Sequence, residues 1–299
     1  MDLDPLSLAT TPVRLFKAGK EVSFATGFFY FDDEAPEKGV FLATNYHALT
    51  GKSPGAKQDL IGDSVQIQFH RSLKDPKRLR TVTLPLLTRN EHPIWAENAH
   101  HVRADMAIVP IPLQLYENCQ VQCVSSEWAK VDLKVRPSSA VTLIGYPEGY
   151  YDTENALPLW KTGHVASEPD MDFKGQPMFL VDVTARRGMS GSPVLAIAQG
   201  AYETLDADDT VTVGVVRKFL GILSSGVTIE RKMPIRELSR LAALGIVDRD
   251  SLDLAHVWKA DLLLEAVRGF DTISYANAVE QHLDEGDVMG FSLMPGPRG

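Results

Sequence analysis

The sequence has few of the residues that stabilise small secreted proteins. Its 299 residues include only two cysteines, Cys119 and Cys123. In an extended segment these two would lie on one face roughly 13 Å apart, which is too far for a disulfide bond. Two cysteines also cannot complete a zinc site without a second pair of ligands nearby. Free thiols suit a reducing compartment, so we expect a cytoplasmic protein without disulfides.

The chain also lacks long hydrophobic runs and an excess of positive charge. No stretch approaches 18 consecutive apolar residues, and the N-terminus has no basic segment followed by a long apolar one. We therefore expect neither a membrane-spanning helix nor a secretory signal. The net charge is −9, from 30 basic and 39 acidic side chains. Phosphate binding needs clustered lysines and arginines, so we do not expect nucleic acid as the main ligand.

Most of the chain has the pattern of short strands separated by turns. Residues 22–31 are rich in aromatic and β-branched side chains, and residues 64–69 alternate between apolar and polar ones. Further strands are expected over 40–45, 81–87, 106–111, 140–144, 178–183, 192–197, 210–216 and 219–224. Many short strands divided by Gly, Pro, Asp and Asn indicate an all-β barrel or sandwich.

The last quarter of the chain has a helical pattern instead. Residues 234–244 place apolar side chains at helical spacing, with Pro234 in the first turn and Gly245 after the end. Residues 261–267 and 274–282 are also expected to be helical. The C-terminal residues are expected to fray.

The segment GMSGSP, residues 188–193, contains a candidate nucleophile. Glycines around Ser190 allow a tight turn that aims the N–H groups of Gly188 and Ser190 into one oxyanion hole. A glycine-serine turn entering a strand explains this motif in isolation about as well. A serine hydroxyl needs a base at neutral pH, so a nucleophilic Ser190 requires a partner from another segment.

Two further segments supply a candidate base and a candidate acid. His47 follows an apolar strand in FLATNYHALTG, where an imidazole can face a cleft. Asp105 directly precedes the apolar run 106–111, and a buried carboxylate needs a hydrogen-bond partner there. Such a partner could be His47, whose tautomer the carboxylate would fix. Taken singly, each residue could equally be an ordinary turn residue.

The three segments occur in the order His, Asp, Ser, and this order resembles that of the chymotrypsin-like (trypsin-like) serine peptidases. The resemblance is nearest to compact bacterial members without disulfides, and it covers about residues 12–268. It includes IGYPEG at 144–149 and FLGILSSGV at 219–227. An α/β-hydrolase is disfavoured, because its triad begins with the serine and its elbow needs a glycine where this chain has Ser192.

The resemblance implies an all-β fold of two antiparallel β-barrels. The helical pattern adds an insertion at 234–244, where the family usually has a short loop, and C-terminal helices. The N-terminal barrel, 12–115, would carry His47 and Asp105. A linker at 116–135 would lead to a C-terminal barrel, 136–268, that carries Ser190, and residues 269–299 would form a helical extension. The implied activity is endopeptidase, with peptide bonds cleaved through an acyl-enzyme.

The resemblance also implies where a substrate would bind. Ser224, Ser225 and Gly226 would pair with the substrate backbone as an added strand. Thr184 occupies the position where digestive trypsins have a specificity-determining aspartate, and Arg186 and Arg187 follow at the pocket entrance. We therefore expect a neutral or acidic residue before the scissile bond (the P1 residue). Met189 replaces the acidic residue that drives zymogen activation in digestive members, so activation by N-terminal cleavage is not expected.

Two other functions remain open. A degenerate peptidase could act as a non-catalytic peptide-binding module. Alternatively, the chain could be a partner-gated protease of a bacterial defence or conflict system that is inactive alone. The expected partners are a protein or peptide substrate and a possible activating protein, and the interpretation requires no cofactor. Three histidines near Asp105 (His92, His100 and His101) favour solvent exposure over a metal site.

Overall fold

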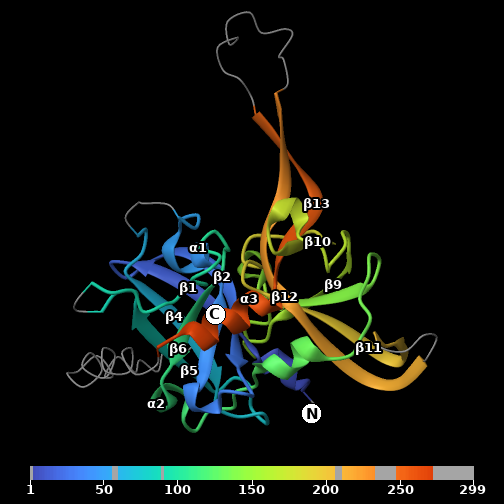
Figure 1. The fold of residues 1–299 in the computed structure, drawn as a ribbon. Helices are drawn as coiled ribbons and strands as arrows, with labels where there is room; N and C mark the ends of the chain where they lie inside the picture. The colour runs from blue at the N-terminus through green and yellow to red at the C-terminus, as the bar shows by residue number, and fades with distance from the viewer. Residues whose placement is uncertain (1–2, 56–59, 89–90, 206–210, 233–246, 272–299) are drawn as a thin grey trace, which may run out of the picture.

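The fold is built from two β-sheets that follow one another along the chain (Figure 1). A computed structural model describes residues 3–55, 60–88, 91–205, 211–232 and 247–271. The side chains of residues 229–232 and 247–250 are not described. No helix among the described residues is both long and apolar enough to cross a membrane.

The N-terminal sheet is an open half-barrel of antiparallel strands. Its strand order is β5-β4-β1-β2-β3-β6, with the short β7 pairing in parallel with β2. Alternate side chains of the expected strand 64–69 point inward, so Val65, Ile67 and Phe69 are buried. The strands are β1 (Thr10–Lys17), β2 (Lys20–Phe31), β3 (Val40–Thr44), β4 (Ser64–His70), β5 (Leu79–Pro85), β6 (Ala107–Ile111) and β7 (Val124–Ser125).

The C-terminal sheet closes into a barrel with the order β10-β13-β12-β11-β8-β9. Its interior is filled by fully buried aliphatic and aromatic side chains, among them Leu143, Val181 and Leu223. The strands are β8 (Ala140–Gly145), β9 (Leu159–Val165), β10 (Met178–Asp182), β11 (Pro193–Glu203), β12 (Val211–Lys232) and β13 (Val247–Lys259).

Helices are few and short among the described residues. Helix α3 (Ala260–Gly269) packs its apolar face, including Leu263 and Val267, on a core that contains residues of both sheets. This helix therefore lies where the two sheets meet (Figure 1). The remaining helices are α1 (Tyr46–Thr50) and α2 (Leu113–Tyr116), with 3₁₀ turns η1 (Pro5–Leu8), η2 (Pro36–Lys38), η3 (Ser126–Lys130), η4 (Pro147–Gly149) and η5 (Phe173–Gly175).

The all-β fold class predicted from the sequence is confirmed, with two corrections. The N-terminal sheet is a half-barrel and not a closed barrel. The two strands expected over 210–216 and 219–224 are parts of one long strand, β12. Strands β1 and β9 were not predicted, because Lys, Arg, Gly and His interrupt their apolar pattern.

The region predicted as a helical insertion is flanked by strands. Beyond Gly226, β12 pairs with β13 as a two-stranded ribbon that projects from the barrel (Figure 1). The predicted helix at 234–244 lies outside the described residues, as does the one at 274–282. The helix predicted over 261–267 is present as α3.

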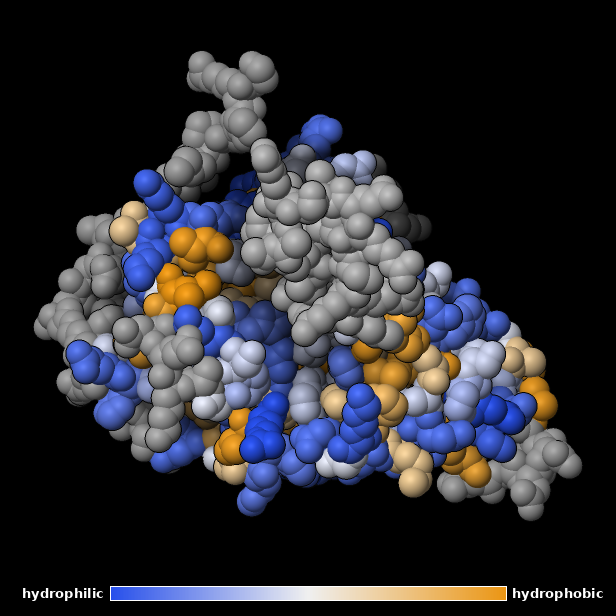
Figure 2. Space-filling model, turned by 90° about the horizontal axis from the view of Figure 1, so that it is seen from above, coloured by the Kyte–Doolittle hydropathy of each residue, from blue (hydrophilic) through white to orange (hydrophobic). Residues whose placement is uncertain are grey.

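Both cysteines are free, as expected, and both are partly buried. Burial raises the pKa of the Cys123 thiol to about 12. Figure 2 shows a face on which hydrophilic residues predominate and hydrophobic ones form small separate patches.

Candidate active site

His47 lies in the first turn of α1, just after β3 ends. Asn45 precedes the helix in an extended conformation, and Gly51 ends it with a left-handed φ of 69°. The backbone N–H of His47 donates to Asp105 Oδ1 at 3.0 Å, and the imidazole Nδ1 lies 2.6 Å from Asp105 Oδ2. An ionised carboxylate only accepts hydrogen bonds, so the proton sits on Nδ1 and the Nε2 of the neutral ring is left as an acceptor.

Asp105 is only 9% exposed and lies two residues before the start of β6. Its Oδ2 also accepts a 2.6 Å hydrogen bond from Ser224 Oγ, and its carbonyl accepts one from Asn45 Nδ2 at 2.6 Å. Burial alone would raise the pKa of this carboxyl, but the hydrogen bonds from His47 and Ser224 hold the pKa below its ordinary value. Asp105 is therefore ionised at neutral pH.

The loop that carries Ser190 depends on two glycines with left-handed backbone. Gly188 has φ 85° and Gly191 has φ 86°. A Cβ on Gly191 would lie 2.0 Å from the carbonyl oxygen of Thr26, which is far inside contact distance. The loop is tied to β12 as well, since Gly191 N–H donates to Leu223 O at 2.8 Å. Only glycine fits this turn without strain.

Thr26 on β2 connects this loop to the N-terminal sheet. Its N–H donates to Ser190 O at 2.9 Å, and its Oγ1 donates to Gly188 O at 2.6 Å. Its own carbonyl accepts from Thr44 Oγ1 at 2.7 Å. Thr26 is fully buried. Nothing in the sequence assigned Thr26 this positioning role.

A continuous chain of hydrogen bonds joins the three predicted catalytic residues. Ser190 Oγ donates to Ser224 O at 3.2 Å, and the Ser224 hydroxyl reaches the carboxylate that holds His47. Among the described residues, no hydrogen bond links Ser190 Oγ directly to the His47 ring. A serine hydroxyl rotates about χ1 between staggered positions, so its direction of donation is adjustable.

The backbone beside Ser190 presents unused donors. Glu148 N–H donates to Arg187 O at 2.5 Å, which fixes the orientation of the 187–188 peptide. In a trans peptide the N–H points opposite to the C=O, so the Gly188 N–H points away from Glu148. Within the described parts of the chain, the N–H groups of Gly188 and Ser190 donate to no acceptor. Two unengaged amides can together hold a negatively charged oxygen.

The predicted substrate-binding residues flank this loop. Ser224 and Ser225 have no paired residue in the register of β12 and β13, because the register shifts between Leu223 and Gly226. Ser225 O accepts a hydrogen bond from His256 Nδ1 at 3.2 Å. Thr184 O accepts a hydrogen bond from Lys161 Nζ, a contact that the sequence did not suggest. The Arg187 side chain is exposed, with no carboxylate within 4.0 Å among the described residues.

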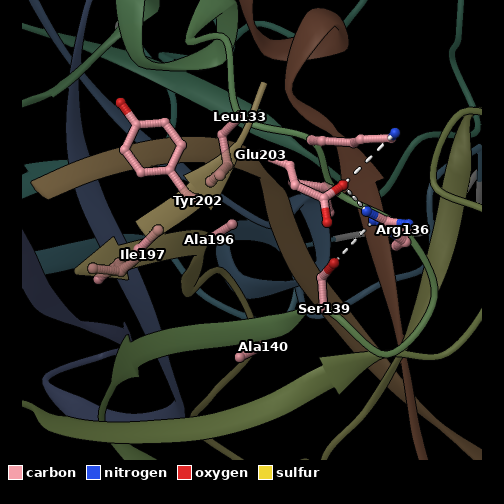
Figure 3. A pocket seen from close by; sticks show the side chains of 11 residues that line it. Leu133, Arg136, Ser139, Ala140, Ala196, Ile197, Tyr202 and Glu203 are labelled. Atoms are coloured by element: carbon pink, nitrogen blue, oxygen red, sulfur yellow. Dashed lines mark hydrogen bonds and ion pairs between the residues drawn. The ribbon is translucent and has the colours of Figure 1, made fainter. Parts of the chain in front are cut away.

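Two open pockets lie away from these residues. One of about 320 Å³ lies between β11 and residues 133–140 (Figure 3). Its charged groups are paired with one another, since Lys134 and Arg136 both contact Glu203. A second cavity of about 330 Å³ includes His164 and Asp182. No group of three potential metal ligands occurs among the described residues, His92, His100 and His101 included.

Fold and site together define a two-sheet protein with a hydrogen-bonded His–Asp pair beside a serine loop. The family model of the trypsin-like peptidase domain matches residues 25–202, more than half of the chain. The chain therefore belongs to the trypsin-like peptidase domain family. This membership supports a serine protease.

Solved structures with similarity to the chain include other serine proteases. The serine endoprotease from Yersinia pestis is 12% identical, with a TM-score of 0.43 over 90% of this chain and 68% of its own. A thermostable serine protease from an extremophilic microorganism is 10% identical, with a TM-score of 0.45 over 89% of this chain and 98% of its own. A search of curated proteins found no match.

Proposed function

We propose that the protein is a serine endopeptidase in which Ser190, His47 and Asp105 act together. The observation that supports this most is the hydrogen-bonded chain from the His47 ring through Asp105 and Ser224 to Ser190. An ionised carboxylate on Nδ1 leaves Nε2 free to take a proton, which is what a serine nucleophile requires.

In the proposed reaction, Ser190 Oγ attacks the carbonyl carbon of the scissile peptide bond and its proton passes to His47 Nε2. The tetrahedral oxyanion is held by the N–H groups of Gly188 and Ser190. When the C–N bond breaks, His47 returns the proton to the leaving amine. Water then repeats the sequence on the acyl-enzyme, with His47 again taking the proton, and frees Ser190.

The substrate would bind as an added strand along Ser224, Ser225 and Gly226. The missing β13 pairing at the two serines leaves this part of β12 less constrained by its neighbour. The P1 residue would lie between this strand and residues 184–187. We propose a neutral or acidic P1 residue, because Thr184 is uncharged and the exposed Arg186 and Arg187 are cationic.

A second candidate is a protease that needs an activating protein partner, as in bacterial defence or conflict systems. The observation that favours it is the Ser190 hydroxyl, which donates to Ser224 O and not to His47. A partner that turned this hydroxyl towards Nε2 would switch the enzyme on. Two free cysteines fit a reducing, cytoplasmic setting for either candidate.

Cleavage of an unfolded protein substrate tests the endopeptidase proposal. The wild type is expected to produce discrete fragments, and Ser190→Ala is expected to produce none. Ser192→Ala is the matched control, because the Ser192 hydroxyl is buried without a hydrogen-bond partner in the structure. Equal fragmentation by wild type and Ser190→Ala would contradict the proposal. A wild type that cleaves only after a cell extract is added would favour the partner-gated candidate.

A further inference from the structure

Lys161 is a partly buried cation beside the proposed P1 position. It lies on β9, on the same side as Gly163 and Val165, both of which are buried. Its Nζ donates to Thr184 O, six residues before Ser190. An ammonium has three N–H donors, so two remain after this bond. The sequence interpretation placed Thr184 near the specificity pocket but gave Lys161 no role.

Gly226, in the proposed substrate-binding strand, lies beside Ala185, the residue that follows Thr184. A Cβ on Gly226 would be at ordinary contact distance, 3.8 Å, from both Ala185 Cβ and Leu254 O. The strand therefore packs closely against the segment whose Thr184 carbonyl accepts the hydrogen bond from Lys161 Nζ. A substrate side chain bound between this strand and residues 184–187 would lie near the Lys161 ammonium.

The charge of Lys161 is not neutralised by its surroundings. No carboxylate lies within 4.0 Å of its Nζ in the described parts of the chain. Asp253 is near enough to influence it, but Arg186 acts in the opposite direction. Burial, together with Arg186, lowers the pKa of Lys161, which means that the charged form lacks a compensating anion. A carboxylate placed here would gain a charge-assisted hydrogen bond.

We propose that Lys161 recognises an acidic P1 side chain and makes the protein selective for cleavage after glutamate or aspartate. This inference rests on the proposed peptidase function and identifies its substrate class. Lys161 is then the main specificity determinant, whereas the exposed Arg186 and Arg187 are screened by solvent and contribute little. A lysine that only supported the Thr184 loop would affect all substrates equally.

The test compares kcat/KM for two peptides that differ only in P1, glutamate against glutamine. The wild type is expected to favour glutamate by about tenfold or more, the effect of one charge-assisted contact. In Lys161→Gln this preference is expected to disappear, with glutamine cleavage retained. Lys161→Arg is expected to restore the preference, and Lys20→Gln is the control that keeps it, because Lys20 is an exposed lysine outside the proposed site.

Labelling with a fluorophosphonate probe separates this inference from the proposed function. A wild type that the probe does not label would refute the peptidase itself. Three outcomes in a labelled enzyme would overturn only the role of Lys161. These are equal kcat/KM for the two peptides, failure to cleave either peptide, and an equal loss for both peptides in Lys161→Gln with no rescue by arginine.

Discussion

The N-terminal sheet contributes to the proposed site through side chains, whereas the C-terminal barrel contributes mostly through its backbone. His47 and Asp105 follow β3 and precede β6, and they are joined by two hydrogen bonds of 2.6 and 3.0 Å. Around Ser190, the important groups are the amides of a loop held open by glycines. Substitutions in the N-terminal sheet should therefore remove a catalytic side chain, whereas substitutions in the C-terminal barrel should distort the backbone of the loop around Ser190.

The largest expected effect comes from replacing a catalytic side chain of the N-terminal sheet. His47→Ala removes the proposed base while leaving the backbone bond between residue 47 and Asp105 available. We expect kcat for a peptide substrate to fall about 10⁶-fold, as for triad serine peptidases in general. His92→Ala is the control, because His92 is exposed. A fall of less than tenfold in His47→Ala would mean that another group is the base.

Asp105→Asn is expected to lower kcat about 10⁴-fold. The amide can donate to Nδ1, which would move the ring proton to Nε2 and remove the acceptor that Ser190 needs. Steady-state kinetics of the folded variant measures this fall. A variant within tenfold of the wild type would show that Asp105 only supports the fold.

The lowered pKa of Asp105 also predicts the direction in which the stability of the fold changes with pH. Its pKa in the folded chain is below the ordinary value of about 3.9, so its ionisation stabilises the fold above that pH. This contribution is lost as the pH falls through the folded pKa. Between pH 5 and 3, Tm of the wild type should therefore fall more than Tm of Asp105→Asn. Parallel Tm curves would contradict the assignment.

The stability of the C-terminal barrel should depend on the backbone conformation of the loop around Ser190. Gly191→Ala would strain a left-handed residue and press a methyl group against Thr26 O, so we expect about 2–4 kcal/mol of destabilisation. Gly149→Ala is a matched control, because φ is 67° there and nothing lies within 4 Å of the added Cβ. Chemical denaturation of both variants measures the difference. Equal losses would show that the contact with Thr26 is unimportant.

The smallest expected effect comes from replacing Ser224, which connects Asp105 to Ser190. Ser224→Ala removes one of the hydrogen bonds to Asp105 Oδ2 but keeps the carbonyl that accepts from Ser190. We expect kcat to fall about tenfold, with little change in KM, because the lost bond only positions the carboxylate. An unchanged kcat in Ser224→Ala would remove Ser224 from the site.

The sequence allowed the fold class and most strands to be predicted, because apolar periodicity is local. It missed β1 and β9, because Arg14 and Lys17 in β1 and Lys161, Gly163 and His164 in β9 interrupt the apolar pattern. The two-barrel fold class is confirmed, but that the N-terminal sheet is a half-barrel could not be predicted, since strand closure depends on pairing between distant segments. The sequence patterns at 40–51 and 104–111 identified His47 and Asp105 as candidates. The hydrogen bonds between these two residues join distant positions in the chain, so local pattern alone could not establish them.

Other parts of the site could not have been derived from local pattern. Thr26, Asn45 and Lys161 act through contacts with residues between 18 and 164 positions away in the chain. Threonine, asparagine and lysine occur in many turns and strands, so their residue types carry no signal for this site. The sequence assigned Ser224 to a strand that pairs with the substrate backbone but gave its hydroxyl no role, and this hydroxyl donates to Asp105.

The central claim is that residues 47 and 190 form one reactive unit, and a covalent probe tests it most directly. The protein is treated with a fluorophosphonate, digested, and the modified residue is located by mass spectrometry. We predict one adduct per chain on Ser190, with labelling lost in His47→Ala and retained in His92→Ala. An unlabelled wild type, or an adduct that persists on Ser190 without His47, would contradict the account.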